Sequence, residues 1–331
     1  MVIMMRNAKI LRRLWGQRCR ELCSCNTTSQ HNSYAFFSMI VSSGNENGTV
    51  EREAIPNRTL KGFDIIDMIK DEIEEECPRI VSCSDILVLA TRDGIVLVQL
   101  ESRIITRAQF WKYGNIHNQC IMAGGLYYPV LMGRRDSKES FFDETMAEIP
   151  RPNGNITETL RLFSLRGFDE RETVALLGGH NIGKIGCEFI QLRFSNFMGT
   201  AIPSGFLEEL MQKCPDDNST ITKMFNEHTA RGLSESAMSY SQGLSALSSF
   251  GTSFDNHYYK TLMRGRGLLF ADQQLMANEK TAAVVMDYAL DEGTKFRTEF
   301  AHAMDKLSNI GVLTGFQEEV RHSCSHLNSD Q

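Results

Sequence analysis

The sequence predicts a mainly α-helical fold, because two helical patterns are clear and strand patterns are few. Isoleucines at positions 65, 66, 69 and 73 recur at the spacing of one helix face, with acidic residues opposite and a stop at Cys77-Pro78. Residues 82–98 form a second, mostly apolar pattern, which places Asp85 inside the core, where a carboxylate needs a partner. The best strand candidate is 127–132.

The rest of the chain extends this prediction. Further helices are expected over 157–163, 169–177, 182–196, 206–213, 256–263, 280–290 and 294–307. Residues 1–50 show no clear periodicity, and residues 234–253, rich in serine and small residues, favour a loop. We find no internal repeat and no heptad run, so neither a repeat protein nor a coiled coil is expected.

The composition narrows the class of protein. A chain of 331 residues, 42% hydrophobic, can bury a large core and corresponds to one large domain or two ordinary ones. Its 35 Lys+Arg and 41 Asp+Glu give a net charge of -6 without a basic block, so we expect no nucleic-acid partner. The apolar runs are shorter than the roughly 20 residues of a membrane helix, so we expect a soluble protein with no membrane partner.

Two features bearing on the compartment oppose each other. Nine cysteines and several Asn-x-Ser/Thr sites are typical of a protein made for an oxidising compartment. The first 15 residues, however, carry four basic residues that interrupt the apolar stretch of a secretory signal. No signal peptide is visible in this sequence.

A glycine-flanked histidine is the first candidate functional residue. In Gly178-Gly179-His180-Asn181-Ile182-Gly183, the histidine is predicted to open a helix. A single histidine is more often packed or solvated than bound to a metal, so the motif alone leaves both readings open. Asp272 is equally open, because it precedes residues 273–276 and could simply cap a helix.

Seven ordered blocks over residues 51–328 closely resemble the plant secretory (class III) haem peroxidases. The blocks are NRTLKGFD (57–64), CPRIVSCSDIL (77–87), GRRDS (133–137), ALLGGH (175–180), FDNHYY (254–259), GLLFADQ (267–273) and NIGVLTG (309–315). The resemblance implies the haem-dependent peroxidase fold, with haem b between distal and proximal helical halves. It also implies a monomer, extracellular or vacuolar, that oxidises small phenolic donors with hydrogen peroxide.

The resemblance gives roles to the central residues. His180 matches the proximal ligand of the haem iron, and Asp272 matches the aspartate that accepts a hydrogen bond from the other ring nitrogen. A carboxylate there fixes the histidine tautomer and gives the ring partial imidazolate character. Asn57 resembles the asparagine that orients the distal histidine.

Further positions carry over as structural or substrate residues. Asp85 with Arg134 or Arg135 resembles the family's buried ion pair. Pro150 matches a proline at the mouth of the haem pocket, near reducing substrates, although Pro-x-Pro alone indicates only a loop. Phe189 can line the same channel, or it can be an ordinary core residue of an amphipathic helix.

The cysteines follow the same resemblance. Cys187 with Cys214, and Cys83 with Cys324, match two family disulfides, and reduced buried thiols are the alternative for each. Cys77 would pair with an N-terminal cysteine, for which the candidates are Cys19, Cys23 and Cys25. For that third bridge we favour reduced thiols.

The distal half departs from the family pattern. A peroxidase needs a distal histidine to move a proton and a distal arginine to stabilise developing charge, both on an Arg-x-x-Phe-His-Asp-Cys helix. That helix is expected near residues 20–37, but His31 is the only histidine there and has no arginine four residues before it. We therefore expect His31 to be a loop residue and activity to be impaired. A non-catalytic haem-binding or scaffold protein of the same fold is the alternative.

Calcium binding is also doubtful on the sequence. The distal calcium ligands are lost with the missing helix. At the proximal site, Asn181 stands where a threonine is usual and Leu247 near where an aspartate is expected, which leaves Asp255 as the clearest oxygen ligand.

We divide the chain into an atypical segment, 1–50, and a peroxidase domain, 51–328, with an insertion at about 98–122. The insertion has no counterpart in the family pattern. An unremoved intron and a mis-chosen first exon would explain both departures together, and we favour that explanation over evolved change.

Overall fold

The computed structural model describes residues 50–57, 60, 62–97, 124–182, 184–191, 193, 202–214, 240–241, 254–316 and 318–330. These residues are mainly helical, which confirms the predicted fold class. The atypical segment 1–50, apart from its last residue, and the whole insertion 98–122 lie outside the described residues, so the predicted division of the chain stays a prediction.

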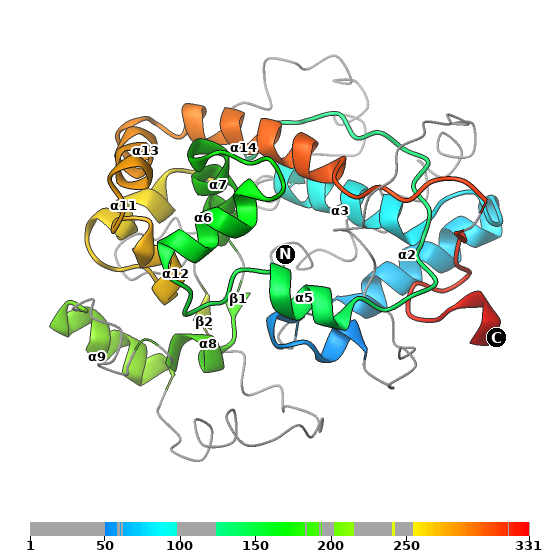
Figure 1. Ribbon diagram of the computed structural model, residues 1–331, viewed down its shortest axis with the longest axis horizontal. Coiled ribbons are helices and arrows are strands. Elements are labelled where there is room, and N and C mark those ends of the chain that lie inside the picture. The colour runs from blue at the N-terminus through cyan, green and yellow to red at the C-terminus, as the bar shows by residue number, and fades with distance from the viewer. Residues whose placement is uncertain are drawn as a thin grey trace, which may run out of the picture.

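Most helices follow the predicted order with small shifts at their ends, while α5 and α12 were not predicted. They are α2 (Phe63–Glu76), α3 (Cys83–Leu97), α5 (Phe142–Glu148), α6 (Ile156–Ser164), α7 (Glu170–Leu177), α8 (Cys187–Gln191), α9 (Ser204–Lys213), α11 (His257–Met263), α12 (Phe270–Gln274), α13 (Glu279–Leu290) and α14 (Thr294–Ser308). Short 3-10 helices cover Glu51–Glu53 (η2), Ile55–Asn57 (η3), Gly178–Asn181 (η6) and Asn328–Asp330 (η10). In Figure 1, α14 runs beside α7, while α11 and α13 lie together at one end.

Helix starts are set by local chemistry. The Asn155 side chain accepts a hydrogen bond from the Glu158 amide and so caps α6. Asp169 and Glu172 form a reciprocal capping box at α7. At α2 the preceding residue is Gly62, with φ 92°, a left-handed conformation that glycine adopts without steric cost. These caps satisfy amide groups that would otherwise be left without partners.

Two sequence predictions of local structure are wrong. Residues 127–132 form no strand; among the described residues the strands are β1 (Lys184–Ile185) and β2 (Tyr240–Ser241), paired antiparallel. In the described part of 182–196, the single expected helix is replaced by β1 and the short helix α8. Gly183 and Gly186 interrupt that stretch, and glycine in a helix interior is unfavourable by about 1 kcal/mol.

The largest core cluster lies where α7, α11, α13 and α14 meet. Its aromatic centre includes Phe254, Tyr259, Tyr288 and Phe296, all buried, with ring centroids of neighbouring pairs 4.8–6.2 Å apart. Burying one large apolar side chain contributes roughly 1.5–3 kcal/mol. This cluster therefore anchors the helices that carry the site described below.

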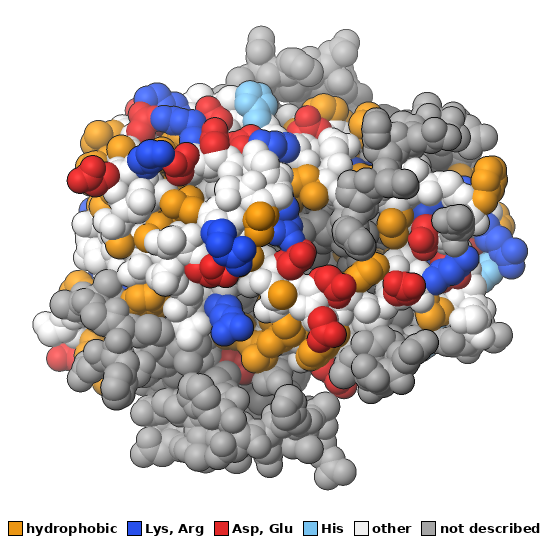
Figure 2. Space-filling model, viewed as in Figure 1, with side chains coloured by type: hydrophobic (Ala, Val, Ile, Leu, Met, Phe, Trp, Pro, Cys, Tyr) orange, Lys and Arg blue, Asp and Glu red, His pale blue; other side chains and the backbone are white. Residues whose placement is uncertain are grey.

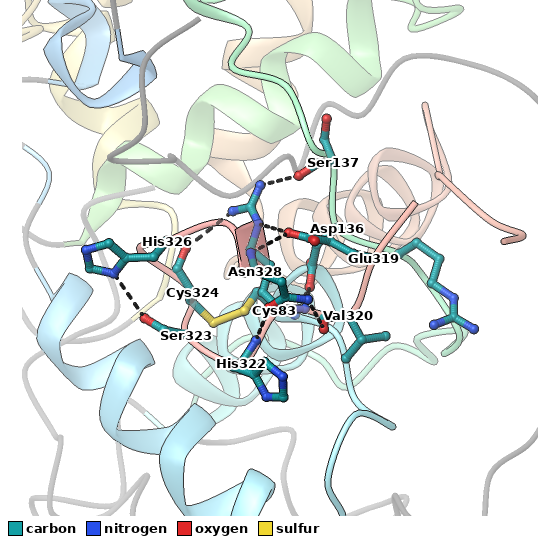
Figure 3. Close-up of polar contacts among 12 residues, drawn as sticks. Cys83, Asp136, Ser137, Glu319, Val320, His322, Ser323, Cys324, His326 and Asn328 are labelled. Carbon is teal, nitrogen blue, oxygen red and sulfur yellow. Dashed lines mark hydrogen bonds and ion pairs between the residues drawn. A yellow bond between two sulfur atoms is a disulfide. The ribbon is translucent and has the colours of Figure 1, made fainter. Parts of the chain in front are cut away.

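The C-terminal tail is fastened to the start of α3 by a buried polar cluster (Figure 3). Asp136 accepts hydrogen bonds from the backbone amides of Cys83 at 3.0 Å, Ser84 at 2.9 Å and Arg321 at 3.1 Å. The wholly buried Arg321 donates to the carbonyls of Ser137 and Cys324. Because buried polar groups without partners are costly, this network holds the tail in one position.

Candidate functional site

His180 is placed by a tight turn at the end of α7. The helix ends at Leu177, and Gly178 and Gly179 lead into η6, which carries the histidine. A Cβ atom at Gly178 would lie 2.1 Å from the Tyr259 hydroxyl and 2.4 Å from a ring carbon of Phe296. Only glycine fits at position 178, so the end of α7 packs closely on the aromatic core. This packing fixes the backbone position of His180.

His180 faces a carboxylate that comes from 92 residues further along the chain. Its Nδ1 lies 2.8 Å from Asp272 Oδ1, and Asp272 is completely buried. An ionised carboxylate can only accept, so Nδ1 carries the proton and Nε2 keeps its lone pair. The His180 side chain is 32% exposed.

Asp272 is itself held by two further donors. Its Oδ2 accepts from the Leu269 amide at 3.1 Å, at the first turn of α12. Its Oδ1 also accepts from the Tyr258 hydroxyl at 2.9 Å. The carboxylate therefore has donors on both oxygens and a fixed orientation toward the histidine.

One buried cation acts on the same carboxylate. Arg193 is buried, and in the described part of the chain none of its guanidinium nitrogens has a hydrogen-bond partner. Burial lowers the pKa of Arg193, and the charge of Asp272 offsets part of that effect.

The arrangement suits an imidazole that binds a metal through Nε2. Metal-binding histidines usually donate their other N–H to a carboxylate or carbonyl, as His180 does. Within the described ranges, no cluster of three or more His, Cys, Asp or Glu residues could hold a metal ion. A metal at His180 would thus bring its remaining ligands with it, as iron does in a porphyrin, so the residues present fit haem.

Comparison with known proteins gives the family. Residues 35–291 match the family described as "Peroxidase". The chain is 38% identical over 297 residues to "Putative Peroxidase 48" of Arabidopsis thaliana, covering 84% of this chain and 67% of that protein. It is 32% identical to Peroxidase 39 (88% and 77% covered) and 34% identical to Peroxidase 49 (84% and 72% covered), both from Arabidopsis thaliana. The chain belongs to the class III plant peroxidase family.

The family's ion pair is formed by Arg134. Its Nη1 lies 3.0 Å from Asp85 Oδ1, and its Nη2 donates to the Ser308 carbonyl at 2.6 Å. Arg135 contributes backbone groups instead: its amide donates to the Leu313 carbonyl, and its carbonyl accepts from the Ser84 hydroxyl. Burial raises the pKa of Asp85, while the Gly133 amide and the Arg134 charge offset part of that rise. Both side chains of the pair are buried, and a structural role stays a prediction.

Two disulfides tie distant parts of the peroxidase chain together. Cys83 is bonded to Cys324, which joins α3 to the C-terminal tail, and Cys187 to Cys214, which joins α8 to the end of α9. The expectation of a reduced thiol at Cys77 is wrong. Cys77 is disulfide-bonded, and its partner lies outside the described residues.

Of the two residues expected near a substrate channel, one precedes α6 in the sequence and the other follows it. Pro150 is partly exposed in the loop before α6, and the same loop is held to α12 by a hydrogen bond of 3.0 Å from the Ala271 amide to the Pro152 carbonyl. Phe189 lies on α8 and is 6% exposed. A channel role for either residue stays a prediction.

The two residues expected at a proximal calcium site, Asn181 and Asp255, take part in hydrogen bonds within the protein. Asn181 Nδ2 donates to the Asp255 carbonyl at 2.7 Å, and Asn181 Oδ1 accepts from the Tyr258 amide at 3.2 Å. Asp255 Oδ1 accepts from the His257 amide at 2.8 Å. Their role toward calcium stays a prediction.

The distal residues are only partly described. Asn57 lies in η3, and its amide donates to the Glu51 carbonyl at 2.9 Å. His31 and the segment 20–37, where a distal histidine and arginine are expected, lie outside the described residues. An orienting role for Asn57 stays a prediction.

Tyr258 and Arg193 were missed at the level of sequence. The block FDNHYY ends in two adjacent tyrosines on a helix, and buried tyrosines need a partner for the hydroxyl, so a polar partner could have been sought for each. No sequence pattern around Arg193 indicated that its side chain would be buried near Asp272.

No helix in the described ranges is long and apolar enough to cross a membrane. On the face shown in Figure 2, acidic and basic side chains are interspersed.

Proposed function

We propose that this class III peroxidase binds haem b through Nε2 of His180 and uses hydrogen peroxide to oxidise small phenolic donors. The single observation that carries the proposal is the 2.8 Å contact between His180 Nδ1 and the buried Asp272, which leaves Nε2 available. When bound, haem supplies an iron centre that can be oxidised by peroxide and returned to rest by two one-electron donors.

The protein's own residues prepare the ligand. Asp272 accepts a hydrogen bond from the Nδ1–H of His180, so the tautomer and ring orientation are fixed before the metal binds. The Leu269 amide and the Tyr258 hydroxyl hold Asp272 in turn. Since these groups are buried, water does not compete for the carboxylate, and the ring keeps its negative partner throughout the reaction.

A haem titration tests the ligand assignment. We expect the purified protein to give a Soret absorption band on adding haem, and His180→Ala to lose it. His302→Ala, a substitution of an exposed histidine on α14, serves as the matched control and keeps the band. Unchanged haem binding in His180→Ala would reject the proposal.

A second candidate function is non-catalytic haem binding. The observation that favours it is the missing Arg-x-x-Phe-His-Asp-Cys motif in residues 20–37. Without a distal base and arginine, proton transfer and charge stabilisation are lost, and each contributes 10²-fold or more. Rapid mixing of the haem-loaded protein with peroxide separates the two: formation of an oxidised-haem spectrum supports the peroxidase, and its absence supports the alternative.

Location in the extracellular space or vacuole is part of the same proposal. Two disulfides in the described chain need an oxidising compartment to persist, and plant relatives of this family are typically secreted. Recovery of the protein from the cell-wall or vacuolar fraction would support this, and recovery from the cytosol with reduced thiols would contradict it.

A further inference from the structure

One carboxylate oxygen of Asp272 is shared by two donors. Asp272 Oδ1 lies 2.8 Å from His180 Nδ1 and 2.9 Å from the Tyr258 hydroxyl. Both donors compete for electron density on the same atom. Because Asp272 is completely buried, water cannot replace either of them.

Tyr258 has little freedom to leave this position. Its side chain is 4% exposed, and its backbone amide donates to Asn181 Oδ1 at 3.2 Å, directly after His180 in the chain. Its ring meets the His180 ring edge-on at 6.4 Å between centroids and the Tyr259 ring at 5.1 Å. The hydroxyl is therefore held against the carboxylate by packing on both sides.

The hydroxyl keeps its proton at neutral pH. Burial, with the nearby charge of Asp272, raises the pKa of Tyr258 well above its ordinary value. Opposite an ionised carboxylate, such a group can act only as a donor. Hydrogen bonds to charged groups are stronger than neutral ones, so the Tyr258 hydroxyl removes negative charge from the oxygen that His180 also uses.

We propose that Tyr258 is a positioning residue that sets how strongly Asp272 draws on the Nδ1 proton of His180, and thereby how basic the ligand nitrogen Nε2 is. This rests on the proposed function insofar as it concerns a bound metal. The hydrogen-bond chain from Tyr258 through Asp272 to His180 exists without a metal, so part of the proposal can be tested on the metal-free protein.

The chain offers a matched control for the test. Tyr259 is the next residue, is completely buried, and also uses its hydroxyl as a donor, to the Val174 carbonyl at 3.1 Å. Because this hydroxyl is directed to Val174, Tyr259→Phe removes the same atom from the same core and leaves the Tyr258–Asp272 hydrogen bond in place. Circular dichroism first establishes that both variants are folded.

The first measurement is the strength of the His180 Nδ1–H hydrogen bond in the metal-free protein, followed by the chemical shift of that proton in nuclear magnetic resonance. Losing the tyrosine donor leaves more charge on Asp272, which then draws more strongly on the Nδ1 proton. Tyr258→Phe should therefore move the Nδ1–H signal downfield, whereas Tyr259→Phe should leave it unchanged. Equal chemical shifts in the two variants would overturn the proposal.

The second measurement uses the haem-loaded protein. A more basic Nε2 binds iron more strongly and favours its higher oxidation state. In Tyr258→Phe the iron–histidine stretching frequency in the resonance Raman spectrum should rise and the reduction potential should fall relative to Tyr259→Phe. A change of the same size in both variants would indicate a packing effect and overturn the proposal. If the wild-type protein binds no haem, the proposed function fails, while the first measurement still decides the role of Tyr258.

Discussion

The Arg134→Leu substitution would leave the Asp85 carboxylate buried without its cation. Both side chains are almost fully buried, at 4% and 3% exposure, and Arg134 also donates to the Ser308 carbonyl. Removing one member of a buried ion pair destabilises a protein by about 3–5 kcal/mol. Leucine keeps part of the apolar packing, and the Gly133 and Arg134 backbone amides still donate to Asp85. We therefore expect a loss of about 3–4 kcal/mol at neutral pH.

Urea denaturation of the oxidised protein, followed by circular dichroism, measures this loss. Arg135→Leu is the control, because the Arg135 backbone amide, which the substitution retains, makes its contact with Leu313. It should change the free energy of unfolding by no more than about 0.5 kcal/mol. If the free energies of unfolding of the two variants differ by less than about 1 kcal/mol, the ion pair does not stabilise the fold as argued.

The pH dependence gives a second check on the same variant. Burial already raises the pKa of Asp85, and loss of the Arg134 charge raises it further. Between the ordinary aspartate value, about 3.9, and the raised value, the folded form binds more protons than the unfolded chain. Lowering the pH from 7 toward 5 should therefore shrink the difference between Arg134→Leu and the wild type. A deficit that grows toward low pH would contradict this reasoning.

Three further predictions concern stability. Replacing Cys83 and Cys324 by serine opens a loop of 241 residues and should lower the free energy of unfolding by about 4–5 kcal/mol, measured by urea denaturation; a loss under about 1 kcal/mol would contradict it. Burial lowers the pKa of His257 despite the nearby Asp255, so the unfolded chain binds more protons than the folded protein and stability should rise with pH through the ordinary histidine range. His257→Gln should flatten this rise in melting curves recorded at pH 5–7. An unchanged slope in that variant would refute the prediction. Because the Asn181 side chain is engaged by protein groups, a calcium chelator should leave the melting temperature unchanged, whereas Asn181→Ala should lower stability by about 1–3 kcal/mol; a large chelator effect would show a calcium site instead.

The sequence predicts helices well where one face is apolar and the ends carry caps. α2 and α14 were placed within one residue at each end, because their apolar residues recur at helical spacing. The prediction for the stretch after His180 failed: its apolar residues continue, but the sequence carries two helix-breaking glycines there, and Lys184–Ile185 pairs with β2 instead. The periodicity of apolar residues does not show whether glycines within the pattern will interrupt the helix.

The site could be predicted only in part. Motif order pointed to His180 and Asp272, although 92 residues separate them and no periodicity relates them. The motif could not show whether Arg134 or Arg135 pairs with Asp85. Adjacent side chains point in different directions, and tertiary packing decides which one faces the carboxylate. Tyr258 was missed for a similar reason, since either tyrosine of the pair could face the carboxylate until α11 is placed against α12.

The most direct test of the account removes the proposed ligand and returns it from solution. In His180→Gly, haem should bind weakly or not at all, and adding imidazole should restore a Soret band saturably, because the free ring can occupy the space beside Asp272. A His180→Gly protein that shows the wild-type haem spectrum without imidazole would contradict the claim that this histidine holds the iron.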